Sequence, residues 1–256
     1  MIKILLSPAK SLNYENVISI QKTFTTQAFF IKEANFLAKK LQKLSSKDLE
    51  KMMHISKDLA ELNKHRYEQW SSPEIENTHC KSCIEVFNGE AYKGLDAQSF
   101  SELEVNYLQE NLRILSGLYG VLKPLDLIYP YRLEMGTKWK IDFKHASLYD
   151  YWKDKLTKYL NNENPNFIIN LSSNEYYKSI DSKKLKAKVI TPIFKEFKNG
   201  DYKIIMMYAK HARGNMTQYC VKNQINDPEE LKLYNELGYS YNEMLSTETD
   251  WVFTRN

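Results

Sequence analysis

Short runs of consecutive apolar residues alternate along the chain with longer segments in which apolar residues recur at every third or fourth position. Continuous runs favour buried strands, whereas the helical spacing favours amphipathic helices. On this basis strands are expected at residues 2–6, 83–87, 112–116, 167–171, 188–197, 202–208 and 251–253. Helices are expected at residues 26–44, 48–53, 57–70, 100–111, 147–161, 212–224 and 228–233.

Turn and cap residues support this division. Asn199-Gly200 between two strand-like segments is typical of a tight β-hairpin. Ser45 or Ser46, and then Ser56, are suitable N-caps for the helices at 48–53 and 57–70, and residues 71–77 form a polar connection. Strands and helices interleave without an internal repeat or a Pro/Gly/Ser-rich linker. The sequence therefore predicts a mixed α/β fold, with a mixed sheet covered by helices, in one compact domain over residues 1–256.

Composition narrows the class of protein. The 256 residues are 43% hydrophobic and 27% charged, which is ordinary for a globular protein that needs no disulfide or metal to fold. Cys80 and Cys83 form a Cys-x-x-Cys, but Cys220 alone does not complete a zinc site, so the pair is interpreted as incidental. The sequence has no signal peptide and no apolar run of about 18 residues. We expect a cytosolic protein without a metal, a cofactor or a membrane partner.

Charge is distributed unevenly around a net value of +4. Residues 178–213 carry ten basic and three acidic side chains, a net charge of +7. Residues 225–256 carry two basic and seven acidic side chains, a net charge of −5. This division favours a basic face for an anionic partner and an acidic face elsewhere. Composition alone is also compatible with solvated lysines that cover several faces.

Three predicted strands end in polar or glycine-rich segments. The first runs into Ser7-Pro8-Ala9-Lys10, the second into Ser116-Gly117, and the third into Asn170-Leu171-Ser172-Ser173-Asn174-Glu175. Loops at the carboxyl ends of strands hold ligands in open α/β sheets, so these segments could form one anion site. The serines and Asn174 are also good N-caps for a helix at 175–178, and local sequence favours that simpler role.

Two further segments combine cations with other ligand-binding groups. Residues 129–134 contain two tyrosines, Arg132 and Glu134. Arginine forks suit phosphates and tyrosine faces suit bases, although Arg132 and Glu134 could simply pair with each other. Arg213 is placed at the start of the predicted helix 212–224, where a cation opposes the helix dipole unless an anion binds there.

Signatures of common enzymes are absent from the sequence. It contains no Gly-x-x-x-x-Gly-Lys-Ser/Thr, Gly-x-Gly-x-x-Gly, Gly-x-Ser-x-Gly or His-Glu-x-x-His motif. Ser7 and Lys10 have the spacing of a Ser-x-x-Lys pair, but that pair needs a helix, and Pro8 here follows a strand. No His/Asp/Glu group has the spacing of metal ligands, so direct iron binding is not expected.

Several of these segments resemble the YaaA family. The resemblance is carried by residues 7–10 (Ser-Pro-Ala-Lys), 87–95 (Phe-Asn-Gly-Glu-Ala-Tyr-Lys-Gly-Leu), 115–135 (with Ser-Gly-Leu-Tyr-Gly-Val-Leu-Lys-Pro-Leu-Asp and Pro-Tyr-Arg-Leu-Glu-Met), 170–178 and 212–214. These segments follow the family order over nearly the whole chain. Ser11 stands where the family usually has threonine, Lys123 where it has arginine, and Ser173 at an alanine position.

The resemblance implies a peroxide-stress protein that limits free intracellular iron and oxidative DNA damage. It also implies DNA binding through a positively charged cleft, in an unusual α/β fold with a helix-hairpin-helix element, for which residues 46–70 are the candidate. The hairpin at 54–56 lacks the glycines expected where a backbone turn contacts phosphate. The residues expected to bind DNA or another anion are Ser7, Lys10, Tyr92, Lys123, Tyr131, Arg132, Asn170, Ser172, Lys178, Lys210 and Arg213.

A second interpretation is an enzyme that acts on a nucleotide or nucleobase in the same polar pocket. Its candidate catalytic residues are Lys10, Glu134 and Glu175. A shallow basic groove would favour phosphate contacts with DNA of any sequence, whereas a deep pocket with a buried carboxylate would favour a nucleotide-like small molecule. Under both interpretations, one cleft is expected to be lined by Lys10, Arg132, Asn170 and Lys210.

Overall fold

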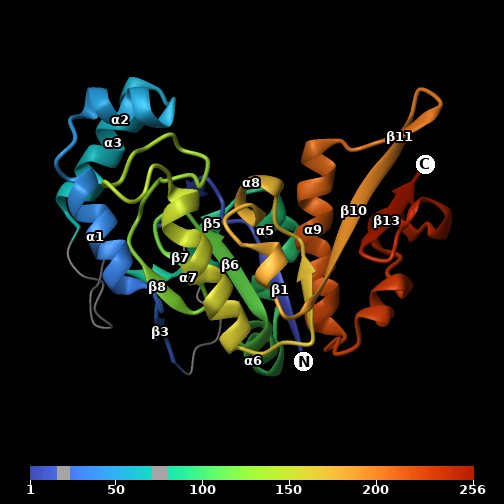
Figure 1. Ribbon diagram of the computed structural model, residues 1–256. Coiled ribbons are helices and arrows are strands. Elements are labelled where there is room, and N and C mark those ends of the chain that lie inside the picture. Colours follow the sequence, from blue (N-terminus) through green and yellow to red (C-terminus); the bar gives the residue numbers. More distant parts are fainter. Residues whose placement is uncertain (16–23, 71–79) are drawn as a thin grey trace.

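The computed structural model describes residues 1–15, 24–70 and 80–256, in which strands and helices interleave along the chain (Figure 1). The strands are β1 (Ile2–Leu6), β2 (Ser11–Leu12), β3 (Thr26–Gln27), β4 (Lys81–Ser82), β5 (Phe87–Asn88), β6 (Leu112–Ser116), β7 (Gly120–Leu122), β8 (Asp126–Ile128), β9 (Phe167–Asn170), β10 (Lys188–Lys198), β11 (Asp201–Lys203), β12 (Ser240–Tyr241) and β13 (Asp250–Arg255). The α-helices are α1 (Ile31–Leu41), α2 (Ser46–Met53), α3 (Lys57–Glu68), α4 (Cys83–Val86), α5 (Glu90–Leu95), α6 (Glu102–Asn111), α7 (Leu148–Asn162), α8 (Asn174–Tyr177) and α9 (Met206–Lys222). Short 3-10 helices are η1 (Ala97–Ser99), η2 (Ser182–Lys184), η3 (Pro228–Leu233), η4 (Glu236–Gly238) and η5 (Glu243–Leu245).

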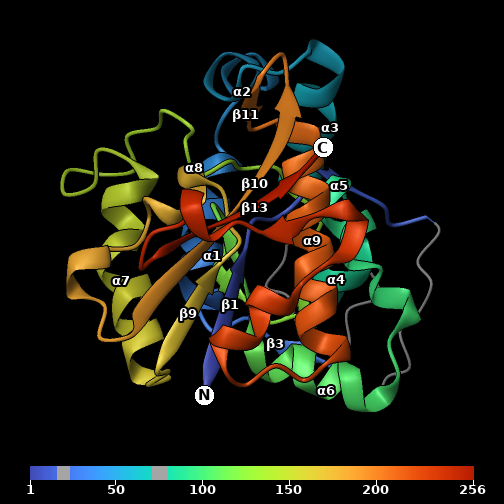
Figure 2. The ribbon, with the colours of Figure 1, turned by 90° about the vertical axis from the view of Figure 1, so that its right-hand side faces the viewer.

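The main sheet has the strand order β12-β13-β10-β9-β1-β6-β7, and β11 pairs with β10 beside this path. The central pairs β6/β1, β1/β9, β9/β10 and β10/β13 are parallel. Antiparallel strands β7, β11 and β12 complete the sheet. Helix α7 covers one face, and α6 and α9 cover the other (Figure 2). The predicted mixed α/β fold, a mixed sheet covered by helices in one compact body, is confirmed.

The parallel strands give the sheet two chemically different ends. Leu6 of β1 pairs in register with Ile114 of β6, and Leu5 pairs with Asn170 of β9. The three strands therefore end side by side, at what we call the carboxyl edge. The opposite end, where these strands begin, is the amino edge. The pair α2–α3, helix α8 and the β10–β11 hairpin all lie toward the carboxyl edge (Figure 1).

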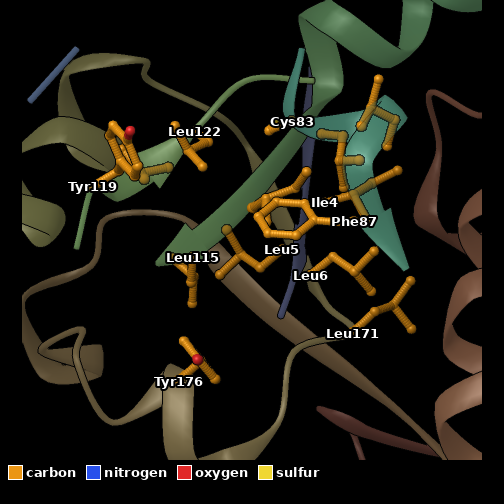
Figure 3. Close-up of a cluster of buried hydrophobic side chains, with 14 of the residues drawn as sticks. Ile4, Leu5, Leu6, Cys83, Phe87, Leu115, Tyr119, Leu122, Leu171 and Tyr176 are labelled. Carbon is orange, nitrogen blue, oxygen red and sulfur yellow. The ribbon is translucent and has the colours of Figure 1, made fainter. Parts of the chain in front are cut away.

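A continuous hydrophobic core reaches the carboxyl edge. All five residues of β1 are buried, which fits its position between β6 and β9. Leu5, Leu6, Phe87, Leu171 and Tyr176 lie in this part of the core, close to the loops that follow the strands (Figure 3). The loops at this edge therefore start from a rigid base.

Helices α5 and α9 contact each other through glycines. A Cβ atom at Gly214 would lie 1.7 Å from the carbonyl oxygen of Ala91, and one at Gly94 would lie 2.2 Å from that of His211. Only glycine permits this approach of two helix backbones. The contact holds residues 87–95 against residues 212–214, two of the segments that carry the family resemblance.

Some predicted elements differ from the structure. Of residues 83–87, expected as a strand, Cys83–Val86 form α4, and only Phe87 belongs to a strand, β5. The strand expected at 202–208 ends at Lys203, because α9 begins at Met206, before the predicted start at 212. The helix expected at 26–44 covers Ile31–Leu41, and Thr26–Gln27 are β3. The polar connection expected at 71–77 lies outside the described residues.

Candidate functional site

Two ion pairs share one carboxylate at the carboxyl edge. Lys10 Nζ lies 2.5 Å from Glu134 Oε2, and Arg132 Nη2 donates a hydrogen bond of 2.9 Å to Glu134 Oε1. Lys10 follows β1, whereas the other two residues follow β8, so the fold joins two distant segments here. The Lys10 side chain is 60% exposed and the Arg132 side chain only 18%. The ammonium group of Lys10 is therefore the accessible cation of this group.

Arg66 of α3 adds a third cation to this edge. The Tyr67 hydroxyl donates a hydrogen bond of 2.8 Å to the carbonyl oxygen of Arg132 and so anchors α3. Burial lowers the pKa of Arg66, and the charge of the nearby Arg132 acts in the same direction. Arg132 Nε is buried and has no hydrogen-bond partner in the part of the chain that the structure describes. Lys10 and Arg132 share Glu134, and Arg66 lies near Arg132, so these three residues, which we call the cation cluster, carry an excess of positive charge.

Ser7 and Tyr92 connect the loops of the carboxyl edge. The amide of Ser173, the N-cap of α8, donates a hydrogen bond of 2.9 Å to Ser7 Oγ. Tyr92 OH donates one of 3.0 Å to the Ser7 carbonyl. Ser173 itself makes no side-chain cap bond, and Ser7, from the loop after β1, accepts the amide hydrogen of this N-cap residue. The two predicted site residues thus position the loops.

Asn170, Ser172 and Tyr131 also lie at this edge, but they are buried and already hydrogen-bonded. Asn170 Oδ1 accepts hydrogen bonds from the amide and the hydroxyl of Ser172, at 3.2 and 2.6 Å. Tyr131 shares a 2.7 Å hydrogen bond with Ser116, and burial raises the pKa of its hydroxyl. These side chains stabilise the strand ends, and their polar groups already have partners within the protein.

The remaining candidates take different positions. Glu175 Oε1 accepts a hydrogen bond of 2.9 Å from the Gly136 amide. Lys178 and Lys210 are exposed. Arg213 lies in the middle of α9, not at a helix start, so the predicted conflict with the helix dipole is wrong. Burial lowers the pKa of its guanidinium, and no partner for this group is found among residues 1–15, 24–70 and 80–256.

Lys123 lies at the other end of the sheet. It follows β7, which runs antiparallel to β6 and pairs Leu122 with Ile114 and Gly120 with Ser116. The chain has therefore returned to the amino edge when it reaches Lys123. Of the four residues expected in one cleft, Lys10 and Arg132 are joined through Glu134, Asn170 is buried nearby, and Lys210 is exposed on α9.

The basic segment 178–213 does not form one face. Lys184 pairs with Asp154 and Lys188 with Glu248, and both lysines precede or begin β10, at the amino edge. The lysines at 195, 198 and 203 lie on the β10–β11 hairpin, toward the carboxyl edge. This second group, together with Lys178 at the end of α8, lies on the same side of the molecule as the cation cluster.

Metal and thiol chemistry receive little support. Within the described ranges no group of three or more His, Cys, Asp or Glu side chains has the arrangement of a metal site. Cys80, Cys83 and Cys220 are buried, unpaired thiols. Burial raises the pKa of Cys80 to about 11 and that of Cys220 to about 12. No described helix is long and apolar enough to cross a membrane.

Comparison with known proteins assigns the chain to a family. The sequence profile of a family described as peroxide stress protein YaaA matches residues 2–245. The chain belongs to this YaaA family. Similar members are the UPF0246 proteins of Teredinibacter turnerae, with 45% identity over 256 residues and 98% of both chains covered, and of Aliivibrio fischeri, with 45% identity over 98% of this chain and 97% of the relative. A UPF0246 protein of Neisseria meningitidis serogroup A is 43% identical over 255 residues, 98% of this chain and 97% of the relative.

The segments that carry the YaaA resemblance meet at the carboxyl edge, with one exception. Residues 7–10 touch 170–178 through Ser7 and 87–95 through Tyr92, and residues 87–95 pack against 212–214. Gly117 of the longest segment also packs directly against the Leu133 carbonyl. The exception is the turn from Lys123 to Asp126, which lies at the amino edge.

Proposed function

We propose that this YaaA-family protein binds DNA of any sequence through phosphate contacts at the carboxyl edge, and so helps to limit iron-dependent oxidative DNA damage during peroxide stress. The observation that carries the DNA part is the cation cluster. Lys10 and Arg132 share one carboxylate, Glu134, Arg66 lies near Arg132, and among the described residues the buried Arg132 Nε has no partner. Two cations that share a single carboxylate keep a net positive charge, which suits phosphate oxygens. The peroxide part rests on the family to which the chain belongs.

The helix pair α2–α3 supports this proposal as a second DNA-facing element. His54 closes the turn between the helices in the left-handed conformation, with φ 51°. This is the conformation for which glycine is usual, so the turn forms although residues 54–56 contain no glycine. Ser56 caps α3 through the Leu59 amide at 3.4 Å, and the start of a 12-residue helix favours anions.

The β10–β11 hairpin supports the proposal from the opposite side. It extends past the carboxyl edge, on the far side of that edge from α2–α3 (Figure 1). Its lysines at 198 and 203 are exposed. Lysine-rich flanks favour phosphate contacts over the bidentate base contacts that arginine makes, which fits binding without sequence preference.

The test is a fluorescence-anisotropy titration of several unrelated duplexes at four salt concentrations. Each phosphate contact contributes about −0.9 to the slope of log affinity against log salt. Lys10→Gln and Arg132→Gln should each weaken binding to all duplexes equally and reduce the slope by about one unit. Lys184→Gln removes the same charge from the amino edge, where Lys184 pairs with Asp154, and should leave the slope unchanged. Affinity that is independent of salt, or absent at low salt, would contradict DNA binding.

The second candidate is an enzyme acting on a nucleotide or nucleobase at the same edge. The observation in its favour is that Lys10, Glu134 and a partly unsatisfied Arg132 follow strand ends, where α/β enzymes bind their ligands. Failure of the duplex titration, together with thermal stabilisation by a nucleotide that Arg132→Gln abolishes, would establish this alternative.

A further inference from the structure

A second site lies at the amino edge, away from the cation cluster. A pocket of about 550 Å³ opens there, a size typical of small-molecule sites. Its walls come from segments around β3, β7 and β8 and from the last turn of α7. The residues that matter for its chemistry are Phe29, Lys123, Asp126, Tyr159 and Glu163.

The two carboxylates of this pocket are already engaged. The Arg113 guanidinium, only 1% exposed, binds Glu163 in bidentate fashion, with Nε 2.9 and 3.0 Å from the two carboxylate oxygens. Asp126 accepts hydrogen bonds from Thr26 Oγ1 at 2.6 Å and from the Lys123 amide at 2.8 Å. Neither carboxylate therefore needs a cationic ligand.

Lys123 supplies the cation of the described wall that makes no ion pair, although its charge opposes the rise that burial causes in the pKa of the nearby Asp126 carboxyl. Its side chain is half-buried, and its ammonium group has no ion pair or hydrogen bond with any residue in the described parts of the chain. A carboxylate ligand would pair with it, because a single negative charge matches a single ammonium. A doubly charged phosphate would be repelled about twice as strongly as a monocarboxylate by Asp126 and Glu163, which line the same pocket.

The remaining wall suits a flat apolar group. The ring of Phe29, a residue 67% exposed, packs edge-on against the ring of Tyr159 with centroids 4.9 Å apart. Phe29 and Tyr159 therefore offer an aromatic surface at the pocket, and aromatic rings prefer aromatic partners. The pocket thus places an aromatic surface and one cation within the same small volume.

We propose that the amino-edge pocket binds a small aromatic monocarboxylate, with its carboxylate on Lys123 and its ring against Phe29 and Tyr159. This site shares no residue with the cation cluster, so it stands independently of DNA binding. It also gives the turn that contains Lys123 and Asp126, one of the family-like segments, a role of its own.

The proposal is tested with benzoate and 4-hydroxyphenylacetate as probes and with benzamide as the neutral analogue of benzoate. Ligand-observed NMR and calorimetry should show saturable binding of both carboxylates, and benzamide should bind at least about tenfold more weakly. Lys123→Gln should weaken carboxylate binding about tenfold or more, and Lys123→Arg should retain most of it. Lys153→Gln removes an exposed lysine of α7 that does not line the pocket, and it should leave the affinity for both carboxylates unchanged.

Phe29→Ala is a second test variant, and it should fold normally because the ring is largely exposed. It should weaken both carboxylates and benzamide alike. Circular dichroism and thermal unfolding establish that each variant is folded before its binding is interpreted. Equal binding of benzoate and benzamide, no saturable binding of either carboxylate, or unchanged binding by folded Lys123→Gln would each overturn the proposal.

Discussion

Glu134 sets how much positive charge the carboxyl edge presents. It is the carboxylate shared by Lys10 and Arg132, so it neutralises part of the cation cluster. Removing its charge while keeping its shape frees both cations for phosphate. Glu134→Gln should therefore tighten DNA binding by about threefold to tenfold and make the salt dependence steeper. Anisotropy at several salt concentrations measures both quantities.

The matched control for this variant is Glu175→Gln. That carboxylate accepts a hydrogen bond from the Gly136 amide and pairs with no described cation, so its charge change releases nothing at the cluster. If Glu134→Gln binds DNA more weakly than the unchanged protein, the prediction is wrong. Glu134 would then serve mainly to position the side chains of Lys10 and Arg132. An enzyme that used Glu134 as its acid or base would lose turnover in the same variant.

The thiols should be slow to react at neutral pH, although the family is linked to peroxide stress. The nucleophile is the thiolate, and burial raises the pKa of Cys80 to about 11, so little thiolate exists below that pH. Alkylation of the folded protein by iodoacetamide should therefore speed up about tenfold per pH unit and level off only near pH 11. In urea the thiols should regain a pKa of about 8.5. A folded-state rate that levels off below pH 9 would contradict this prediction.

Some residues that the sequence singles out are neighbours in the fold. Lys10 follows a predicted strand, Arg132 and Glu134 stand in the segment 129–134, and two ion pairs join the three residues. Arg66 was missed because it sits in an ordinary helix, and only the packing of α3 through Tyr67 brings it to the edge. The sequence did not show that Lys123 lies away from Lys10 and Arg132, because the antiparallel pairing of β7 with β6 was not predicted.

At the scale of elements, the helix caps were predicted correctly from neighbouring residues, whereas the start of α9 and the type of the element at residues 83–86 were not. Ser45 and Ser56 cap α2 and α3 as predicted, because a cap depends on neighbouring residues only. The start of α9 was missed because its cap residue, Ile205, makes no side-chain hydrogen bond, and Met206 and Met207 are exposed. The strand expected at 83–87 is a helix over Cys83–Val86, since a short apolar run fits either element.

The α5–α9 contact gives a stability prediction. A methyl group at Gly214 would collide with the Ala91 carbonyl, so Gly214→Ala must separate two helix backbones. We expect a loss of about 3 kcal/mol in the free energy of unfolding, measured by urea denaturation. Gly89→Ala is the control, because its Cβ would lie at an ordinary 3.4 Å from that of Ala9 and its backbone is extended. A loss at Gly214 no greater than at Gly89 would refute the close approach.

On the scale of the whole molecule, the sheet separates two kinds of site. The five residues of β1 span about 16 Å between the two edges. The carboxyl edge gathers cations from strand loops and from α3, with one shared carboxylate. The amino edge holds a buried arginine–glutamate pair and a lysine that makes no ion pair with the described residues, beside aromatic rings. Parallel strands produce this separation, because their beginnings and ends cannot meet.

The separation predicts that variants at the two edges act independently. Lys123→Gln should weaken benzoate binding about tenfold and leave the affinity for duplex DNA unchanged within about twofold. Lys10→Gln should weaken DNA binding and leave benzoate affinity unchanged. In the double variant the two changes in binding free energy should each persist within about 0.5 kcal/mol, because distant sites without shared partners are additive. Calorimetry for benzoate and anisotropy for DNA measure this on the same preparations. If saturating benzoate changes the affinity for DNA, the two sites are coupled, and the prediction of independent sites is wrong.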